Sequence, residues 1–333
     1  MLTAKTVPDS GNLVLPSDVL NDLNALELHI KASLNSEASI LNDIPTYLLG
    51  LGGKRIRPLL VFLSAKLLNH KELSLDLLNI AAGIELIHMA TLLHDDIIDK
   101  APLRRNKESA FKKYGESKTL LAGNFLFVKA FGLCAKLDPF IIEQTESACV
   151  ELTEGEVLEE LSQFQIDQSL TISAKKTASL FCLAALSGVF VATKDKEPAI
   201  NFSDFGRSMG IAFQISDDIL DVISKRDVLG KEPGTDIRER KPSLVNCLWL
   251  KSGSTLAKEI LVSGTSPTPN LIAESLSEIK DGSIIHEARQ IGITYVERAD
   301  RALEELIRRQ PNHCVATTNL FKSLLQFALD RLN

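Results

Sequence analysis

Apolar residues recur at helical spacing along most of this chain, and Pro or Gly interrupts the pattern at intervals of roughly 20 to 30 residues. Short segments of alternating apolar and polar residues, which are typical of β-strands, do not form a series. The stretch 188–193 (GVFVAT) could form a strand, but it continues a helical pattern that starts near Lys176, so we interpret it as helix. The pattern predicts an all-α protein.

Two stretches depart from the helical pattern. Residues 1–17 are polar and contain Pro8, Gly11 and Pro16, so we expect a loose N-terminal arm, with Ser17 placed to cap the first helix. Residues 252–269 are rich in Ser, Gly, Thr and Pro, which favours a long connection between helices.

The composition indicates a single domain. Since 45% of the 333 residues are hydrophobic and 5% are aromatic, the chain can bury a large aliphatic core, and we expect residues 1–333 to form a single domain.

Three aspartates stand at the end of an apolar helical run in the stretch 85–105 (ELIHMATLLHDDIIDKAPLRR). Asp95 and Asp99 are four residues apart and therefore share a helix face, with Asp96 beside them. Pro102 disfavours helical geometry at the residue before it, so we expect the helix to end near the aspartates, where its dipole already presents partial negative charge. Carboxylates crowded there repel one another unless a cation lies among them, and oxygen ligands of this kind suit Mg2+.

A second cluster with the same spacing follows later in the chain. One cluster alone could equally be a solvated patch at a helix end, but the segment FQISDDILD repeats the arrangement with Asp217, Asp218 and Asp221 after another apolar run. Two such clusters on facing helices could hold several Mg2+ ions between them, and the ligand that suits this arrangement is a diphosphate. The sequence therefore predicts a site for metal ions and a diphosphate.

Basic residues beside two glycines form another candidate anion site. In the segment 52–58 (GGKRIRP) the glycines permit close approach of the backbone, and Lys54 and Arg57 stand three residues apart and share a face. Taken alone, the segment could be a solvated loop. Beside the two aspartate clusters, it indicates a binding site for phosphate.

Net charge and cysteine content narrow the class of function. The formal net charge of -6 disfavours nucleic acid and acidic membranes as partners of the whole protein. The five cysteines lack the spacing of metal sites and suit reduced thiols. The chain has neither an uninterrupted apolar segment of the roughly 18 residues that a membrane span needs nor a basic start followed by an apolar run. We expect no transmembrane segment and a cytoplasmic location.

These motifs, in this order, resemble those of the trans-isoprenyl diphosphate synthases. The resemblance covers residues 48–244 and rests on GGKRIRP, on ELIHMATLLHDDIID with Arg104 and Arg105, on Lys176-Thr177, and on FQISDDILD and GKEPGTD. Within the family, the first aspartate segment most resembles the long-chain polyprenyl synthases of the octaprenyl, heptaprenyl and solanesyl type. The resemblance implies one large helical bundle of the isoprenoid synthase type with a central apolar cavity.

The resemblance also implies a role for each matching residue. The diphosphate of isopentenyl diphosphate would contact Lys54, Arg57, His88 and Arg105. The allylic diphosphate would contact Arg104, Lys176, Thr177, Gln214 and Lys231. Three Mg2+ ions, for which Mn2+ can substitute, would be held by Asp95, Asp96, Asp99, Asp217, Asp218 and Asp221. The residues expected to act in catalysis are Asp95, Asp99, Asp217, Arg104, Lys176 and Gln214. Without the resemblance, His88 would pass for a core histidine, and Lys176 and Lys231 for ordinary surface or loop residues.

The implied reaction is head-to-tail prenyl transfer. Mg2+ and basic side chains draw charge onto the allylic diphosphate until its carbon–oxygen bond breaks, and the double bond of isopentenyl diphosphate attacks the carbocation. The carbocation survives only where water is excluded, which agrees with aspartates placed at the ends of apolar helices. The resemblance further implies a homodimer.

Several positions depart from the family pattern. Asn106 stands where Gly is usual, and Glu108 and Ser109 lie where a Pro-Thr pair is expected. Asn124 replaces the Asp of a GDFL segment, and Glu159 replaces a Gln. In the segment after the second cluster, Gly, Thr and Pro are replaced by Arg240, Ser243 and Val245. None of these changes removes an expected metal ligand, so we expect them to affect rate and loop closure rather than the class of reaction.

Product length depends on what lies beneath the first cluster. Because each helical residue rises about 1.5 Å, Ala90 and Thr91 lie roughly 6 to 7.5 Å below Asp95, where a short prenyl tail would end. Short-chain relatives commonly have an aromatic residue at the position of Ala90. Its absence predicts that the tail continues toward Ile87 and Ile84 and that the product exceeds twenty carbons. Candidates for the floor of such a tunnel, for which core packing is the simpler explanation, are Phe125, Phe127 and Phe131.

Other functions share parts of this pattern. A geranylgeranyl diphosphate synthase would carry the same motifs, and so would a non-catalytic partner subunit of a heteromeric synthase, although the intact aspartates argue against the subunit. A terpene cyclase usually carries an Asn, Ser and Glu motif where this chain has DDILD. A purely structural helical protein would not need two such clusters.

Overall fold

The computed structural model describes residues 14–224 and 232–332 of the protein, and almost all of its regular structure is helical. The first helices are α1 (Ser17–Ser33), α2 (Ile40–Gly50), α3 (Ile56–Leu67) and α4 (Leu75–Ile98). A small hairpin, β1 (Leu103–Arg104) and β2 (Lys107–Glu108), precedes α5 (Ala110–Tyr114), α6 (Glu116–Cys134) and α7 (Pro139–Glu160). Next come α8 (Ile166–Ile172), the π-helix η1 (Ser173–Ala178), α9 (Ser179–Thr193) and α10 (Lys196–Ile223).

The last third of the chain is also helical. It contains α12 (Thr235–Arg238), α13 (Leu244–Lys251), α14 (Thr255–Ala257), the π-helix η2 (Lys258–Val262), α15 (Pro269–Asp281), α16 (Ile284–Arg309) and α17 (Val315–Leu332). The all-α prediction is confirmed, and the stretch 188–193 is helical as expected. The long connection predicted for residues 252–269 is partly wrong, because α14 and η2 lie inside it and only residues 252–254 and 263–268 are without helix.

Sequence signals account for several helix ends. Ser74 caps α4 by accepting a hydrogen bond from the backbone N–H of Leu77, and Asp138 does the same for α7 ahead of a proline in its first turn. Ser17 is itself the first residue of α1, and the N-cap position falls to Pro16, so the predicted cap lies one residue too far along the chain. Most of the predicted N-terminal arm lies outside the described residues.

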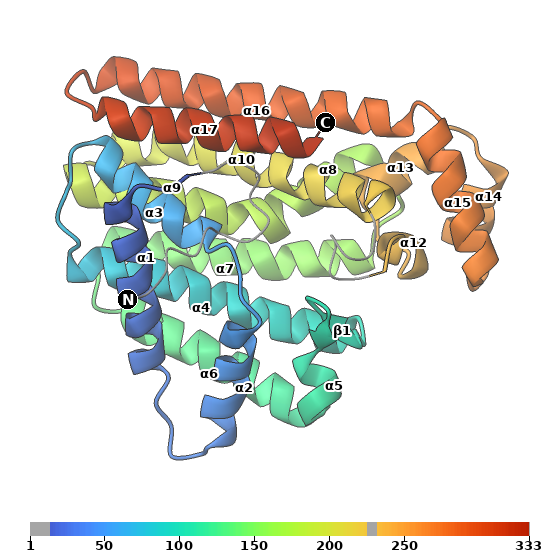
Figure 1. Ribbon diagram of the computed structural model, residues 1–333, viewed down its shortest axis with the longest axis horizontal. Helices are drawn as coiled ribbons and strands as arrows, with labels where there is room; N and C mark the ends of the chain where they lie inside the picture. Colours follow the sequence, from blue (N-terminus) through green and yellow to red (C-terminus); the bar gives the residue numbers. More distant parts are fainter. Residues whose placement is uncertain (1–13, 225–231, 333) are drawn as a thin grey trace.

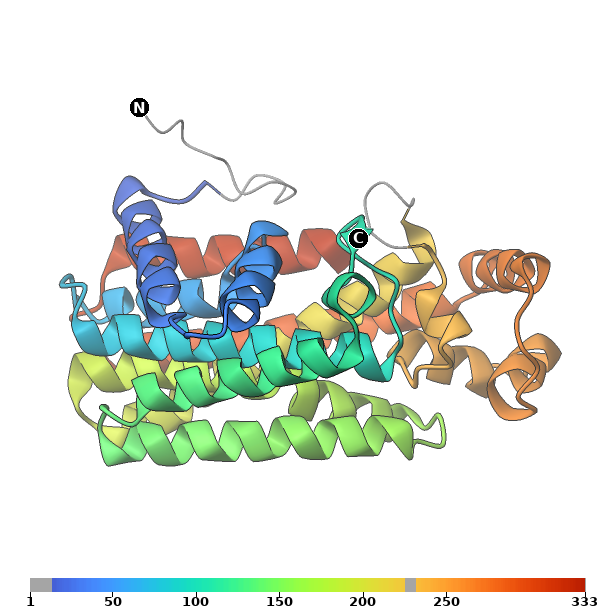
Figure 2. The same cartoon turned by 90° about the horizontal axis from the view of Figure 1, so that it is seen from below.

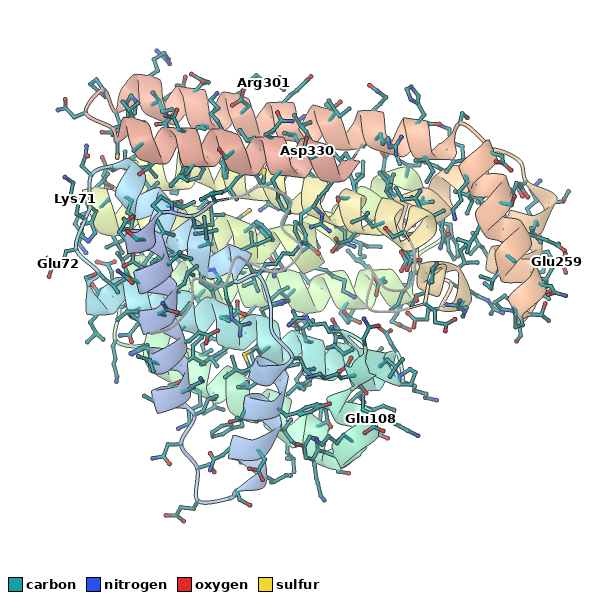
Figure 3. All side chains as sticks on the ribbon, viewed as in Figure 1. Lys71, Glu72, Glu108, Glu259, Arg301 and Asp330 are labelled. Carbon is teal, nitrogen blue, oxygen red and sulfur yellow. The ribbon has the colours of Figure 1, made fainter. Side chains whose placement is uncertain are left out.

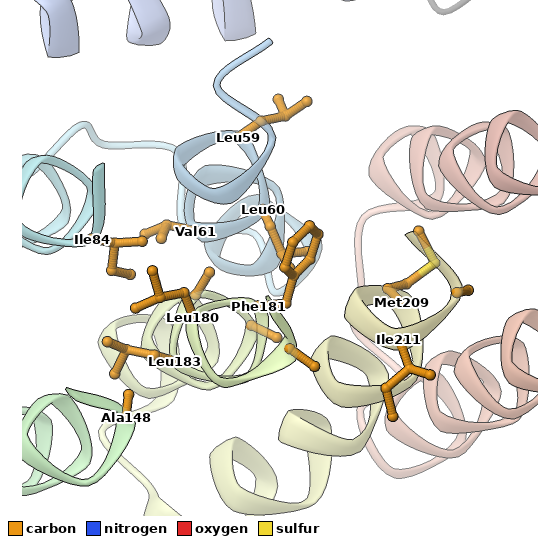
Figure 4. Close-up of a cluster of buried hydrophobic side chains, with 14 of the residues drawn as sticks. Leu59, Leu60, Val61, Ile84, Ala148, Leu180, Phe181, Leu183, Met209 and Ile211 are labelled. Carbon is orange, nitrogen blue, oxygen red and sulfur yellow. The ribbon is translucent and has the colours of Figure 1, made fainter. Parts of the chain in front are cut away.

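Helix α9 is the centre of the bundle. Its residues from Ser179 to Val191 are all buried, which is the pattern of a helix surrounded by others. A Cβ at Gly188 would come within 2.3 Å of the carbonyl oxygen of Val61, so the glycine permits α9 and α3 to approach closely. Side chains of α3, α9 and α10, including Leu180 and Met209, form part of the shared hydrophobic core (Figure 4).

The other helices surround this centre. Helices α16 and α17 run side by side and pack on α10 (Figure 1). Helix α6 packs on α4, and α7 lies on the far side of the bundle from α1 (Figure 2). Charged side chains such as Lys71, Glu72 and Arg301 project outward and are exposed (Figure 3).

Two helices, α4 and the continuous run from α8 to α9 (Ile166–Thr193), are long and apolar enough to cross a membrane by length and composition. In each, about three quarters of the apolar window is buried in the bundle (72% and 78%). Burial in the core explains their composition, so they are weak evidence for a membrane span.

Candidate active site

The first aspartate cluster lies where α4 ends, as the sequence predicts. The helix runs to Ile98, Asp99 follows it as the C-cap, and Lys100 adopts a left-handed conformation that turns the chain away. Burial raises the pKa of the Asp95 carboxyl to about 7, although the charge of Lys176 acts in the opposite direction. A carboxylate held in this way favours binding of a further cation.

Asp96 does not share this environment. It is fully buried; its Oδ1 atom accepts a hydrogen bond from Nε of Arg104 (2.8 Å) and forms a salt bridge with Nη2 of the same residue (2.7 Å). The sequence assigns Asp96 to the metal and Arg104 to the allylic diphosphate, but in the structure the two residues are paired with each other. The Oδ2 atom of Asp96 is buried and has no hydrogen-bond partner among the described residues, so the metal role of Asp96 stays a prediction.

The hairpin that carries Arg104 also explains one departure from the family pattern. Arg105 and Asn106 are its two turn residues, and both have positive φ angles (52° and 61°). A two-residue turn of this kind requires left-handed conformations, which Asn adopts more readily than most residues. Asn106 therefore preserves the turn that Gly would form.

The second cluster lies in the last two turns of α10. Asp218 is buried and accepts hydrogen bonds from Nε2 of Gln214 (2.9 Å) and from the backbone N–H of Leu244 (2.8 Å). Burial raises the pKa of the Asp218 carboxyl to about 7. Asp221 is also buried and accepts a hydrogen bond from the backbone N–H of Asp236 (3.1 Å). Asp217 is the most accessible member of the cluster, with 44% of its side chain exposed.

A short segment between α12 and α13 connects the two clusters. Nζ of Lys241 lies 2.5 Å from Oδ1 of Asp99 in the first cluster, and three residues later the N–H of Leu244 binds Asp218 in the second. The two clusters therefore lie on either side of one segment, as the sequence predicts for a shared site. Lys241 is a site residue that the sequence prediction missed.

A chain of alternating charges continues from Lys241 across the site. Oε2 of Glu159 lies 3.0 Å from Nζ of Lys241 and 2.6 Å from Nζ of Lys176, which in turn lies 2.6 Å from Oε2 of Glu156. These four side chains and that of Asp99 are at most 23% exposed. Although burial opposes it, the two lysines hold the pKa of Glu159 below its ordinary value. Four separate segments meet in this chain of charges.

Lys176 and Thr177 lie in the π-helix η1, a distortion that occurs frequently at functional sites. A Cβ at Gly155 would come within 2.8 Å of Cγ of Lys176, so the glycine permits α7 and η1 to lie in contact. The hydroxyl of Thr177 donates a hydrogen bond to Oε1 of Gln214 (2.7 Å). The structure thus joins two predicted residues of the allylic site to the second cluster.

The segment 52–58 forms a second basic region. Gly52 and Gly53 have positive φ angles of 86° and 150°, and Arg55 is left-handed and forms a salt bridge of 2.7 Å with the buried Glu85. A Cβ at Gly53 would come within 3.1 Å of the guanidinium of Arg105. The segment that carries Lys54 and Arg57 therefore lies next to Arg105, as expected for one binding region. Arg55 and Glu85 were not predicted as site residues.

Arg57 and His88 lie at the buried side of this region. Burial lowers the pKa of Arg57 to about 10, and its guanidinium lies 5.0 Å from the ring centroid of Phe181. Burial, together with the charges of Arg57 and Arg105, holds the pKa of His88 well below its ordinary value. A neutral histidine beside several arginines can donate a hydrogen bond to an anion without adding charge.

The C-terminal helix completes the site with a residue that the sequence analysis missed. The guanidinium of Arg331 in α17 is paired with Asp217 and lies 4.5 Å from the ring centroid of Phe213. It also lies 5.8 Å from Phe327, whose ring is 5.4 Å from Nζ of Lys54. These contacts join α17 to both the second cluster and the segment 52–58.

Within the described ranges 14–224 and 232–332, no three His, Cys, Asp or Glu side chains converge closely enough to hold a metal ion by themselves. The individual carboxylates nevertheless fit Mg2+, which usually takes one or two protein carboxylates and completes its shell with water and phosphate oxygens. The raised pKa values of Asp95 and Asp218 agree with sites where a cation would stabilise the ionised form. The residues present therefore fit Mg2+ bound together with a diphosphate.

The remaining predicted residues are placed as follows. Ala90 and Ile87 are fully buried, and Thr91 is half-buried with its hydroxyl bonded to the carbonyl of His88. Phe131 is 42% exposed, which excludes it as a tunnel floor inside this chain. Phe125 and Phe127 are partly buried and pack against the core. Lys231 lies outside the described residues.

Comparison with known proteins shows the family. The model of the polyprenyl synthetase family matches residues 38–274. The octaprenyl diphosphate synthase of Escherichia coli K12 is 35% identical over 228 residues, which cover 67% of this chain and 70% of that protein. The geranyl-diphosphate-specific all-trans-nonaprenyl-diphosphate synthase of Rhodobacter capsulatus is 32% identical over 326 residues, covering 94% and 96% of the two chains.

A solved structure has the same fold along nearly its whole length. The polyprenyl synthase of Caulobacter crescentus, crystallised with calcium and isoprenyl diphosphate, superposes with a TM-score of 0.86 at 27% identity and covers 97% of this chain and 99% of its own. The chain belongs to the polyprenyl synthetase family. It is therefore an enzyme of the prenyltransferase class, as the motifs predict.

Proposed function

We propose that this enzyme condenses isopentenyl diphosphate with an allylic diphosphate, head to tail and with Mg2+, to form a long all-trans polyprenyl diphosphate. The observation that carries the proposal is the joining of two partly buried aspartate clusters by the segment that holds Lys241. Basic residues lie beside both clusters, so two diphosphates can be bound next to each other.

The basic residues divide into two sets with different tasks. Lys176 and Lys241, beside Asp95 and Asp99, are placed to bind the allylic diphosphate and to stabilise the negative charge that develops as it leaves. Arg57, with Lys54 and Arg105, is placed to bind the diphosphate of isopentenyl diphosphate; its burial makes each hydrogen bond to that anion stronger than it would be in water.

The metal and the apolar interior complete the proposed mechanism. Mg2+ bound at the aspartates would supply Lewis-acid stabilisation of the leaving diphosphate. The aspartates stand at the ends of α4 and α10, whose buried faces are apolar, so the reacting carbons lie where water is excluded. No side-chain nucleophile is required.

The proposed chain length rests on the buried, small side chain of Ala90 below Asp95. A methyl group at this buried position fills less space than an aromatic ring would, and from this we infer that a growing tail can continue toward Ile87. The long-chain relatives support this proposal.

We also propose a homodimer and a cytoplasmic location. Helices α6 and α7 expose apolar side chains, including Leu121 (58%), Val128 (68%) and Val157 (53%), which suit an interface with a second copy. All five cysteines are free thiols, which agrees with a reducing compartment. Light scattering during gel filtration tests the dimer, and a monomeric mass would contradict it.

Activity of purified variants tests the proposed reaction. Asp95→Ala and Asp217→Ala should each lower the rate of prenyl transfer by orders of magnitude with Mg2+ present, because each removes charge needed mainly in the transition state. The exposed Glu160 provides a matched control, and Glu160→Gln should keep the wild-type rate. Near-normal rates in either aspartate variant would refute the assignment. Activity of the wild type only after a second protein is added would favour the partner-subunit alternative.

A further inference from the structure

Glu159 is placed where an anion would be expected to bind. A single carboxylate oxygen of Glu159 contacts the ammonium groups of both Lys176 (2.6 Å) and Lys241 (3.0 Å). These are the two lysines that the proposed function assigns to the allylic diphosphate. A phosphate oxygen that takes up hydrogen bonds from both lysines would need the position that Glu159 now fills.

Because Glu159 and the two lysines are largely buried, the Glu159 carboxylate and an incoming diphosphate should compete strongly for the lysines. The side chain of Glu159 is 15% exposed, and those of Lys241 and Lys176 are 17% and 20% exposed. Charges at such positions are only partly screened by water and salt. A diphosphate that approaches the lysines therefore meets the negative charge of Glu159 as well.

The two outer carboxylates of the chain of charges differ from Glu159. Of the two lysines, Glu156 forms a salt bridge with Lys176, and Asp99 forms one with Lys241. Glu159 alone among the described residues of this chain of charges touches both lysines. Replacing it removes the one anion that both ammonium groups share.

We propose that Glu159 is a positioning residue that occupies the diphosphate site of Lys176 and Lys241 and thereby weakens the binding of diphosphates there. The assignment of that site rests on the proposed function. Before substrate binds, the carboxylate holds both ammonium groups in place and satisfies their charge. After the reaction, the Glu159 carboxylate competes with the released pyrophosphate for the two lysines. This competition favours departure of the pyrophosphate before the next isopentenyl unit is added to the prenyl product.

Glu159→Gln tests the proposal because it removes the charge and keeps the shape. We expect the dissociation constant of inorganic pyrophosphate, measured by isothermal titration calorimetry with Mg2+ present, to fall roughly three- to tenfold, the effect of one partly screened charge at contact distance. The KM for the allylic diphosphate should fall in the same direction, and the KM for isopentenyl diphosphate should stay unchanged. Glu156→Gln should show a smaller decrease, and the exposed control Glu160→Gln should show none.

An unchanged or weaker affinity of Glu159→Gln for pyrophosphate would overturn the proposal. If the unfolding temperature also fell, the result would show that Glu159 only fastens α7 to the neighbouring segments. Calorimetry does not depend on turnover, so absence of prenyl transfer by the wild type would refute the proposed function separately.

Discussion

Replacing Asp95 by Asn should stabilise the metal-free protein while it abolishes activity. Burial raises the pKa of Asp95 from 3.8 to about 7, so the ionised carboxylate opposes folding. One pKa unit corresponds to about 1.36 kcal/mol, so a shift of roughly three units amounts to about 4 kcal/mol at most above pH 7. Structural relaxation reduces this figure, and we expect Asp95→Asn to raise the free energy of unfolding by about 2 to 4 kcal/mol at pH 8.

The effect should depend on pH with a defined sign. Near pH 4 the carboxyl is largely protonated in the folded state, so it opposes folding little. As pH rises from 4 to 7 the unfolded chain loses this proton before the folded chain does, so wild-type stability falls relative to the variant. Urea unfolding in the presence of EDTA at pH 4.5 and pH 8 measures the difference. Glu160→Gln, an exposed carboxylate, controls for the loss of one charge. A variant that is less stable than the wild type at pH 8 would refute the reasoning.

Three further predictions concern substrate binding, pH and product length. Lys54→Ala and Arg57→Ala should each raise the KM for isopentenyl diphosphate about 10- to 100-fold, since each removes a charge-assisted hydrogen bond worth about 1.5 to 3 kcal/mol; steady-state kinetics that show an unchanged KM would reduce the segment 52–58 to a structural loop. Because burial holds the pKa of His88 well below its ordinary value, the unfolded chain takes up a proton that the folded chain does not, so the wild type should lose stability relative to His88→Gln as the pH falls below 6.5; a difference that is constant between pH 5 and pH 7.5 would contradict this. Ala90→Phe should shorten the products by filling the tunnel with a ring, and chromatography that shows an unchanged distribution would refute the tunnel.

Local signals in the sequence were sufficient to predict the helices and the two aspartate clusters. Apolar spacing places α4 and α10, and Pro102 indicates where α4 ends. Local reasoning does not predict the pairing of Asp96 with Arg104, because whether a residue at a helix end faces inward depends on the rotation of the helix against its neighbours. Its neighbour Asp95 differs by one position and has a different environment.

The contacts that were missed join segments far apart in the chain. Lys241 is 142 residues from Asp99, and Arg331 is 114 residues from Asp217. A lysine in a loop or an arginine near the end of a helix is common, and nothing local distinguishes these two. The turn at Asn106 is different, because an Asn between two short extended segments is a local signal for a hairpin turn.

The central claim is that this one chain elongates an allylic diphosphate with isopentenyl diphosphate. The most direct test incubates the purified protein alone with farnesyl diphosphate, labelled isopentenyl diphosphate and Mg2+, followed by chromatography of the dephosphorylated products. We predict labelled polyprenols longer than twenty carbons, and none when EDTA replaces Mg2+. No labelled prenol, or products that stop at twenty carbons or fewer, would contradict the proposed long-chain synthase.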